Sequence, residues 1–171
     1  MRNATTFFVT ALMLPVAALS ARAVNDAQIA AIVVTANQVD IDAGKLAETS
    51  ASDPQVKAFG KQMATDHAGV NKQATELVTK LGVTPEDNPT AQSLKSGGAD
   101  NVKTLSGLKG ADFDRVYIEH EVAYHQQVLD ALDKTLIPGA QNAELKALLV
   151  KVRPAFVAHL EHAKMVQKSL K

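Results

Sequence analysis

Histidine and acidic side chains are the residues of this sequence best suited to chemistry. The chain of 171 residues contains five His and no Cys. Without Cys it cannot form a disulfide, a zinc ribbon, an iron–sulfur cluster, a thiol nucleophile or a c-type haem attachment. Any metal ion must therefore be held by imidazole and carboxylate groups, which suit iron, manganese, copper or zinc.

Six of these side chains are expected to point toward the interior. Apolar residues recur at steps of three and four around each of them, so a helical projection at about 100° per residue places them on the apolar face or at its edge. Glu121 and His125 are four residues apart and therefore share one face of their helix. The candidate metal ligands are His67, Glu121, His125, His159, Asp40 and Asp66.

These residues are also expected at similar heights along their helices. Asp40 and His67 lie roughly 12 and 15 residues from the first interhelical turn, and Glu121 and His159 each lie roughly 19 residues from the last one. Burying such groups costs several kcal/mol unless they are paired or coordinate an ion. Two explanations stay open: the groups bond to one another and fix the helix register, which is the more common use, or they hold one or two metal ions.

The sequence contains segments that resemble the motifs of particular enzymes but differ from them in spacing. His120 and His125 form H-E-x-x-x-H, one residue longer than the zinc-protease motif, which separates the two imidazoles by about 140°. The Glu-x-x-His signature of di-iron bundles is absent, since Glu121 and His125 are four residues apart and His159 pairs with His162. An enzymatic activity is therefore neither predicted nor excluded.

Four long helices are expected to position the candidate ligands. Apolar periodicity and capping signals predict helices over about residues 26–50, 54–81, 112–136 and 142–170. Between the second and third, we expect a crossover with a short irregular helix over about residues 90–105, weakened by Gly97 and Gly98. This pattern predicts an all-α, antiparallel four-helix bundle of the ferritin-like type, with a long helical crossover.

The N-terminus has the features of a cleavable export signal. Arg2 precedes an apolar stretch over residues 7–19, and Ala21-Arg22-Ala23 matches a signal-peptidase site. We therefore expect a signal peptide over residues 1–23, a bundle domain over residues 24–171 and a location in the periplasm. A retained N-terminal anchor and association with the outer membrane are alternatives. No later apolar run reaches the about 20 residues of a membrane span.

Composition and charge narrow the range of partners. The chain has 18 Lys and Arg against 18 Asp and Glu, and 4% of its residues are aromatic. A nucleic-acid partner is not expected, because such proteins present basic stripes or stacking aromatics. With 46% hydrophobic residues the chain can bury a core. Contacts with envelope proteins remain open, and the sequence identifies no specific partner.

Several segments resemble a known bacterial family. They are QVDIDAGKLA at residues 38–47, PQVKAFGKQM at 54–63 followed by Asp66-His67 and Asn71-Lys72, FDRVY at 113–117, YHQ at 124–126, and Arg153-Pro154 followed by His159-Leu160. Together they resemble the domain-of-unknown-function 4142 family of exported proteins, which carry a membrane or outer-membrane label. The resemblance implies a ferritin-like bundle, a Gram-negative envelope location and three histidines to test: His67, His125 and His159. It implies no reaction.

Two functions therefore remain. The first is an exported, non-catalytic helical protein of the periplasm, associated with the envelope or with stress, in which the inward polar groups set helix register. The second is a metal-binding or metal-dependent redox protein with its His and carboxylate ligands in the core of the bundle. The two differ in whether the buried groups satisfy one another.

Overall fold

Helices make up almost the whole of the computed structural model, which describes residues 24–170. The signal peptide expected over residues 1–23 lies outside the described residues. Residues 24–170 contain no strand, as the apolar periodicity predicts. The elements in chain order are α1 (Asp26–Ser50), α2 (Pro54–Lys80), α3 (Pro89–Ser106), α4 (Gly110–Ala131), the π-helical turn η1 (Leu132–Leu136), α5 (Ile137–Gly139) and α6 (Ala143–Ser169).

Local capping signals set the helix boundaries. The side chain of Asn25 accepts a hydrogen bond from the Gln28 amide at 2.8 Å, which begins α1. Asp53 caps α2 in the same way, with Pro at the first helical position. Gly82 has a φ of +64°, a conformation that glycine adopts without strain, and follows the end of α2. Asn142 caps α6. The expected and observed ends of these three helices differ by one residue or less.

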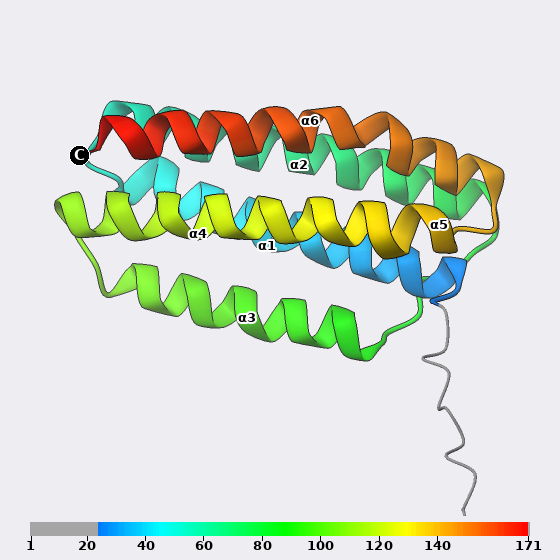
Figure 1. Cartoon of the computed structure of the whole chain (residues 1–171). Helices are drawn as coiled ribbons and strands as arrows, with labels where there is room; N and C mark the ends of the chain where they lie inside the picture. The colour runs from blue at the N-terminus through cyan, green and yellow to red at the C-terminus, as the bar shows by residue number, and fades with distance from the viewer. Residues whose placement is uncertain (1–23, 171) are drawn as a thin grey trace, which may run out of the picture.

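The four longest helices pack as two hairpins around a shared interior. Figure 1 shows α1 beside α2 and α4 beside α6, with α6 lying along α2. The α1 and α2 backbones approach so closely that a Cβ atom on Gly44 would lie 2.6 Å from the carbonyl oxygen of Gly60. This close approach fixes the relative height of α1 and α2.

The buried apolar residues form two separate clusters along the helices. One cluster includes Ile32, Leu132 and Phe156, and the other includes Phe59 and Tyr117. On α1, α2 and α4, buried polar residues lie between the stretches that contribute to the two clusters, and on α6 His159 lies near the end of the stretch of the first cluster. The middle of the interior is therefore polar, with apolar packing on both sides.

The crossover differs from the short irregular helix that the sequence predicts. Residues 89–106 form the regular α3, which packs on the outer side of α1 (Figure 1). Gly98 is buried, and a Cβ there would lie 2.6 Å from Cγ2 of Val39. The glycine therefore permits close packing of α3 on α1, and the helix is regular where the sequence predicts an irregular helix weakened by Gly97 and Gly98. The described residues thus contain five long helices in place of the expected four.

The third expected helix also changes geometry before its end. The α-helical part, α4, ends at Ala131 and continues as the π-helical turn η1, which has one more residue in each hydrogen-bonded ring. Such turns are rare and often occur at functional sites. Pro138 lies in the short α5 that follows. The chain then turns at Ala140, which has an extended backbone, and enters α6.

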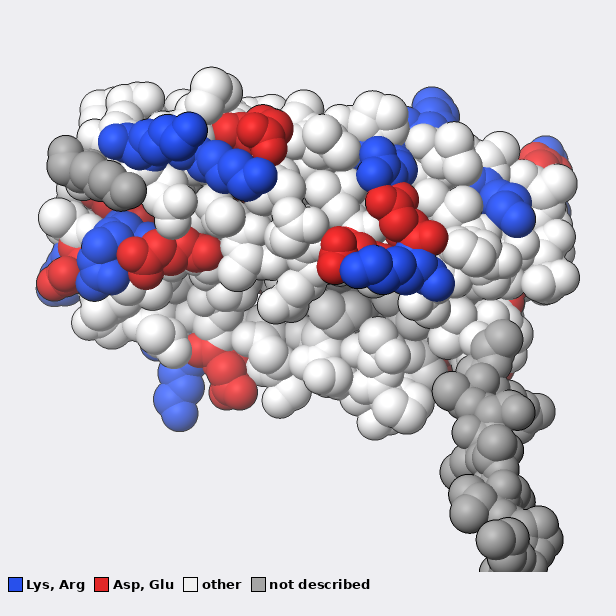
Figure 2. Space-filling model, in the orientation of Figure 1, with Lys and Arg blue, Asp and Glu red and all other residues white. Residues whose placement is uncertain are grey.

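The molecular surface carries charges of both signs close together. Figure 2 shows Lys and Arg interspersed with Asp and Glu on the face in view. The described residues include ion pairs such as Arg153 Nε to Asp133 Oδ1 at 2.6 Å. Among the described helices, none is long and apolar enough to cross a membrane.

Candidate metal centre

The polar layer between the two apolar clusters brings together five of the six candidate ligands. Each of them is at most 3% exposed, although all five are ordinarily charged or partly charged in water. They come from four different helices: Asp40 on α1, His67 on α2, Glu121 and His125 on α4, and His159 on α6. The direction in which each side chain points from its helix and its height along the helix therefore bring the five residues together, as the sequence predicts.

The distances within this cluster are those of groups arranged around a small centre. One nitrogen from each of His67, His125 and His159 lies within 4.8 Å of the others, and Asp40, Glu121 and His125 form a second such group. Nε2 of His67 is 3.3 Å from Oδ2 of Asp40, and Nε2 of His125 is 4.0 Å from the same oxygen. Two ligand atoms of one tetrahedral ion, each about 2.1 Å from it, are about 3.4 Å apart.

The tautomer of His67 is fixed by Asn37. Nδ1 of His67 lies 2.7 Å from Oδ1 of Asn37. The Asn37 amide nitrogen donates to the Val33 carbonyl at 3.0 Å, so the oxygen must face the imidazole. The Nδ1–H of His67 therefore donates, and Nε2 keeps a lone pair directed toward the cluster.

His125 and His159 are fixed by the same kind of contact. Nδ1 of His125 lies 3.0 Å from the main-chain carbonyl of Glu121, to which it donates. Nε2 of His159 lies 3.0 Å from Oδ2 of Asp66 and donates to that carboxylate. The second nitrogens, Nε2 of His125 and Nδ1 of His159, then carry lone pairs. Histidines that bind a metal are typically held in this manner through their other ring nitrogen.

The ring nitrogens of the three histidines that face the cluster make no hydrogen bond in place of those they would make to water. Within the described part of the chain, Nε2 of His67, Nε2 of His125 and Nδ1 of His159 are buried without a hydrogen-bond partner. All four carboxyl oxygens of Asp40 and Glu121 are in the same condition. A protonated carboxyl of Asp40 or Glu121 can bond to a neighbour, but Nε2 of His125 lies 4.0 Å from Asp40, beyond hydrogen-bond distance. Buried polar atoms are paired in the great majority of cases, so the unpartnered ring nitrogens call for a bound group.

Burial shifts the protonation of every group in the cluster toward its neutral form. It raises the pKa of Glu121 to about 8 and that of Asp40 well above its ordinary value, which the neighbouring Glu121 raises further. Burial lowers the pKa of His125 to about 4, and it also lowers those of His67 and His159. Burial therefore favours the uncharged form of each of these groups when no ion is bound.

Aromatic side chains enclose the cluster. The Phe156 ring lies 5.1 Å from the His67 ring and about 6 Å from those of His125 and His159, centroid to centroid. Both tyrosines are buried, as expected of core residues. Tyr124 donates to the Ala36 carbonyl at 3.0 Å, whereas the Tyr117 hydroxyl has no partner within residues 24–170.

A surface groove connects the cluster to solvent. It lies between α2 and α6, has a volume of about 430 Å³, and reaches His67 and His159 at its base. Asp66 also lines the groove, and its side chain is 44% exposed. Through its bond to His159, Asp66 links the solvent to the buried centre.

The structure separates Asp66 from the other candidate ligands. Asp66 is the one candidate that lies outside the two buried groups, because its carboxylate bonds the outward nitrogen of His159. Sequence reasoning missed Asn37, which is buried and orients His67. Its position three residues before Asp40, on the same helical face, was a usable signal.

Comparison with known proteins supports the resemblance noted in the sequence. The family model described as "Domain of unknown function (DUF4142)" matches residues 11–166, which is most of the chain. No curated protein and no solved structure matches the chain. The function must therefore be argued from the site itself.

Proposed function

The chain belongs to the DUF4142 family, and we propose that it binds a transition-metal ion in its buried polar layer. The proposed ligands are the inward nitrogens of His67, His125 and His159 together with a carboxylate oxygen of Asp40. One observation carries the proposal: three imidazoles, each held by a hydrogen bond that one ring nitrogen donates, meet in one buried layer, and their other ring nitrogens have no hydrogen-bond partner.

Charge balance supports the same function. Two buried carboxylates facing each other repel, and burial raises both pKa values. A divalent ion would balance the two negative charges of deprotonated Asp40 and Glu121, so the occupied layer would carry no net charge. The ion would thus replace two protons at no cost in net buried charge.

The donor set favours some metals over others. Three imidazoles with one or two carboxylates suit zinc, copper and iron, while manganese prefers sites richer in carboxylate. His67, His125, His159 and Asp40 would complete a four-coordinate shell, the arrangement of sites that hold an ion permanently. Glu121 would lie beside this shell. We therefore propose retention of the ion, without turnover, as the function.

The proposed setting is the periplasm. The basis is the sequence alone: an apolar stretch over residues 7–19 followed by Ala21-Arg22-Ala23. In fold terms, we propose that α1, α2, α4 and α6 form a ferritin-like four-helix bundle, with α3 as an elaborated crossover. The site would then use one ligand from each bundle helix, with Glu121 of α4 beside it.

A purely structural role is the alternative. In that case the polar layer would set helix register, and the protein would act in the envelope through its surface without an ion. The unpartnered ring nitrogens of His125 and His159 disfavour this alternative, because groups that fix register do so by bonding to one another.

Metal analysis distinguishes the two functions. The protein would be purified from the periplasm without chelator, its bound metals measured by mass spectrometry, and its melting temperature followed with added Zn²⁺, Cu²⁺, Fe²⁺ or Mn²⁺. We expect about one ion per chain and a rise in melting temperature, because binding to the folded state stabilises it. Protein without bound metal, whose melting temperature none of these ions changes, would contradict the proposal.

Histidine variants provide the control. A triple variant with His67→Ala, His125→Ala and His159→Ala should lose the ion. His162→Ala is the matched control, since His162 lies on α6 near the groove but contacts Gln62 at 3.0 Å and belongs to neither buried group. Equal metal content in both variants would place the bound ion elsewhere.

A further inference from the structure

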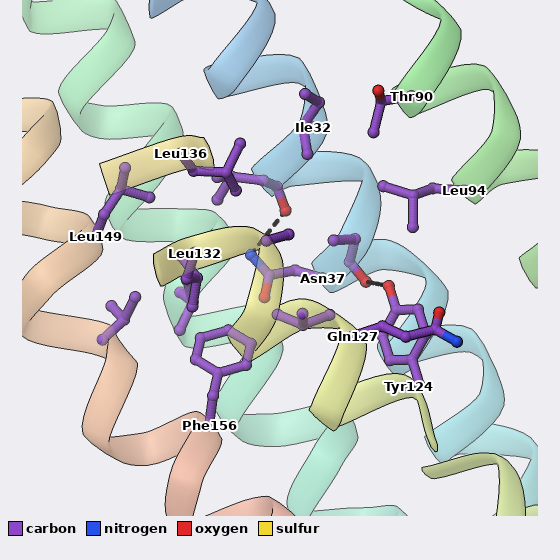
Figure 3. A pocket seen from close by; sticks show the side chains of 16 residues that line it. Ile32, Asn37, Thr90, Leu94, Tyr124, Gln127, Leu132, Leu136, Leu149 and Phe156 are labelled. Atoms are coloured by element: carbon purple, nitrogen blue, oxygen red, sulfur yellow. Dashed lines mark hydrogen bonds between the residues drawn. The ribbon is translucent and has the colours of Figure 1, made fainter. Parts of the chain in front are cut away.

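An apolar cavity lies next to the polar layer and is separate from it. Its volume is about 200 Å³, and its walls come from α1, α3, α4, η1 and α6, with Val70 of α2. Figure 3 shows Leu132, Leu136 and Leu149 on one side of the cavity and Leu94 of α3 on the other. No group of the His and carboxylate cluster lines it.

A void of this size is unusual in a protein interior. Cores are packed at the density of organic crystals, with few gaps larger than a water molecule. A cavity lined by apolar side chains stays dry, because water there would lose its hydrogen bonds. Engineered apolar cavities of about 150 Å³ bind benzene or xenon. The volume and lining seen here therefore meet the requirements for an apolar guest.

From this geometry we propose that the cavity binds a small apolar molecule, the size of one aromatic ring or a short hydrocarbon chain. Dispersion contacts with the leucine side chains and with the Phe156 ring would hold it. Binding would remove apolar surface of both the molecule and the walls from contact with water or empty space. This proposal does not depend on a metal ion.

The cavity is built by particular features of the chain. The π-helical turn η1 supplies Leu132 and Leu136 to one wall, and both are buried. Ala36 and Ala131 also line the cavity, so two wall positions carry the smallest apolar side chain with a Cβ. Larger residues at these two positions would fill the space.

The side of the cavity facing α3 offers an opening. Thr90 and Gln127 line it there and are exposed, while Leu94 is half-buried (Figure 3). α3 is anchored at Gly98 against α1, and connecting segments precede and follow it. A guest can therefore enter between α3 and α4, with its apolar body toward Leu149 and Phe156.

The test uses the mature protein with metal removed by chelator. Its melting temperature would be measured with benzene and with toluene, and with glycerol as a polar molecule. We expect benzene and toluene to raise the melting temperature by about 2–4 °C at near-saturating concentration, and glycerol at the same concentration to leave it unchanged. An unchanged melting temperature with both aromatic probes would overturn the proposal.

Cavity-filling variants locate the binding site. Ala131→Leu fills the cavity from α4 and Ala36→Leu fills it from α1, so each should remove at least half of the benzene-induced shift. Ala58→Leu is the matched control, because Ala58 is exposed on α2 and does not line the cavity. Two filling variants guard against one that fails to fold. A full shift in both folded variants would also overturn the proposal, since the probe would then bind elsewhere.

Because the test is made on metal-free protein, its outcome is independent of the proposed metal site. Asn37 and Phe156 border both the cavity and the histidine cluster. If both sites are occupied, a guest would contact the residues that orient and enclose His67. A failure of the benzene test with intact metal binding would remove only the cavity proposal.

Discussion

His67 donates from Nδ1 to the side-chain oxygen of Asn37 at 2.7 Å, which leaves its Nε2 lone pair 3.3 Å from Oδ2 of Asp40. This contact decides what His67 can do. An imidazole whose outer nitrogen is committed as a donor can only accept with its inner one. The inner nitrogens of His125 and His159 are in the same state. A protonated Asp40 carboxyl could serve one acceptor, whereas a shared cation would satisfy all three.

Removing the Asn37 oxygen should weaken metal binding without touching a ligand. For Asn37→Leu we expect a loss of about 10–100-fold in Zn²⁺ affinity, the usual effect of removing a group that orients a ligand histidine. Asn37→Asp keeps an acceptor at this position and should retain most of the affinity. Competition titration against a coloured chelator measures both. Equal affinities in wild type and Asn37→Leu would show that His67 does not bind the ion.

Stability of the metal-free protein should fall as the pH rises above 6.5. Burial raises the pKa of Glu121 from 4.5 to about 8, so the folded state binds a proton more tightly than the unfolded state and loses this advantage as that proton leaves. The lowered pKa of His125 makes stability rise with pH, but only between its pKa of about 4 in the folded state and its ordinary pKa of 6.5. Above pH 6.5 the carboxyl effect therefore remains alone.

Between pH 6.5 and 8 the free energy of unfolding should decrease by about 2 kcal/mol for each carboxyl with such a shift. Urea denaturation of chelator-treated protein at several pH values measures it. In the double variant with Asp40→Asn and Glu121→Gln, this part of the pH dependence should disappear. A slope that is the same in wild type and double variant would mean that other groups carry the pH dependence.

The sequence predicts the cluster because the helix has a fixed period. At 3.6 residues per turn, the apolar stripes around His67, Glu121 and His159 determine which side of each helix faces the interior. The heights follow from the 1.5 Å rise and from short loops that the capping residues Asp53 and Asn142 identify. The phase of each helix and the height of each residue along it together predict that these side chains converge, without knowledge of tertiary contacts.

Other features depend on contacts that periodicity does not contain. In the sequence Gly98 predicts a weakened helix, yet its missing side chain is what allows α3 to pack on Val39. Asp66 reads as a ligand because it lies at the edge of the apolar stripe, but it bonds to the far side of His159. The cavity follows from the combined shape of several helices and from the π-helical turn, neither of which a single-helix pattern encodes.

Asp66 should control how firmly the ion is held. It is half-exposed in the groove and orients His159 by accepting a hydrogen bond at 3.0 Å. Asp66→Ala should lower Zn²⁺ affinity by about tenfold and speed loss of the ion to chelator, because His159 then loses its orienting partner. Asp42→Ala is a suitable control, since Asp42 is exposed on α1 and bonds to Gln38. Loss rates that are the same in the two variants would contradict this role.

The contact between Gly44 and Gly60 should determine both stability and metal binding. A methyl group on Gly44 would lie 2.6 Å from the Gly60 carbonyl and 3.0 Å from the Ala64 amide nitrogen, so α1 and α2 would have to move apart. Overpacking of this kind costs about 1–3 kcal/mol. Because Asp40 on α1 faces His67 on α2, the same movement would lengthen their 3.3 Å contact and weaken metal binding.

A substitution at Gly97 should have the opposite effect on stability from one at Gly44. It is exposed within α3, and a Cβ there would contact nothing within 4 Å. Gly97→Ala should therefore stabilise the protein by up to about 1 kcal/mol, since alanine loses less backbone freedom in a helix, and should leave Zn²⁺ affinity unchanged. Urea denaturation and chelator competition on Gly44→Ala and Gly97→Ala give the comparison. Gly44→Ala with wild-type stability and affinity would show that the close approach of α1 and α2 does not set the geometry of the site.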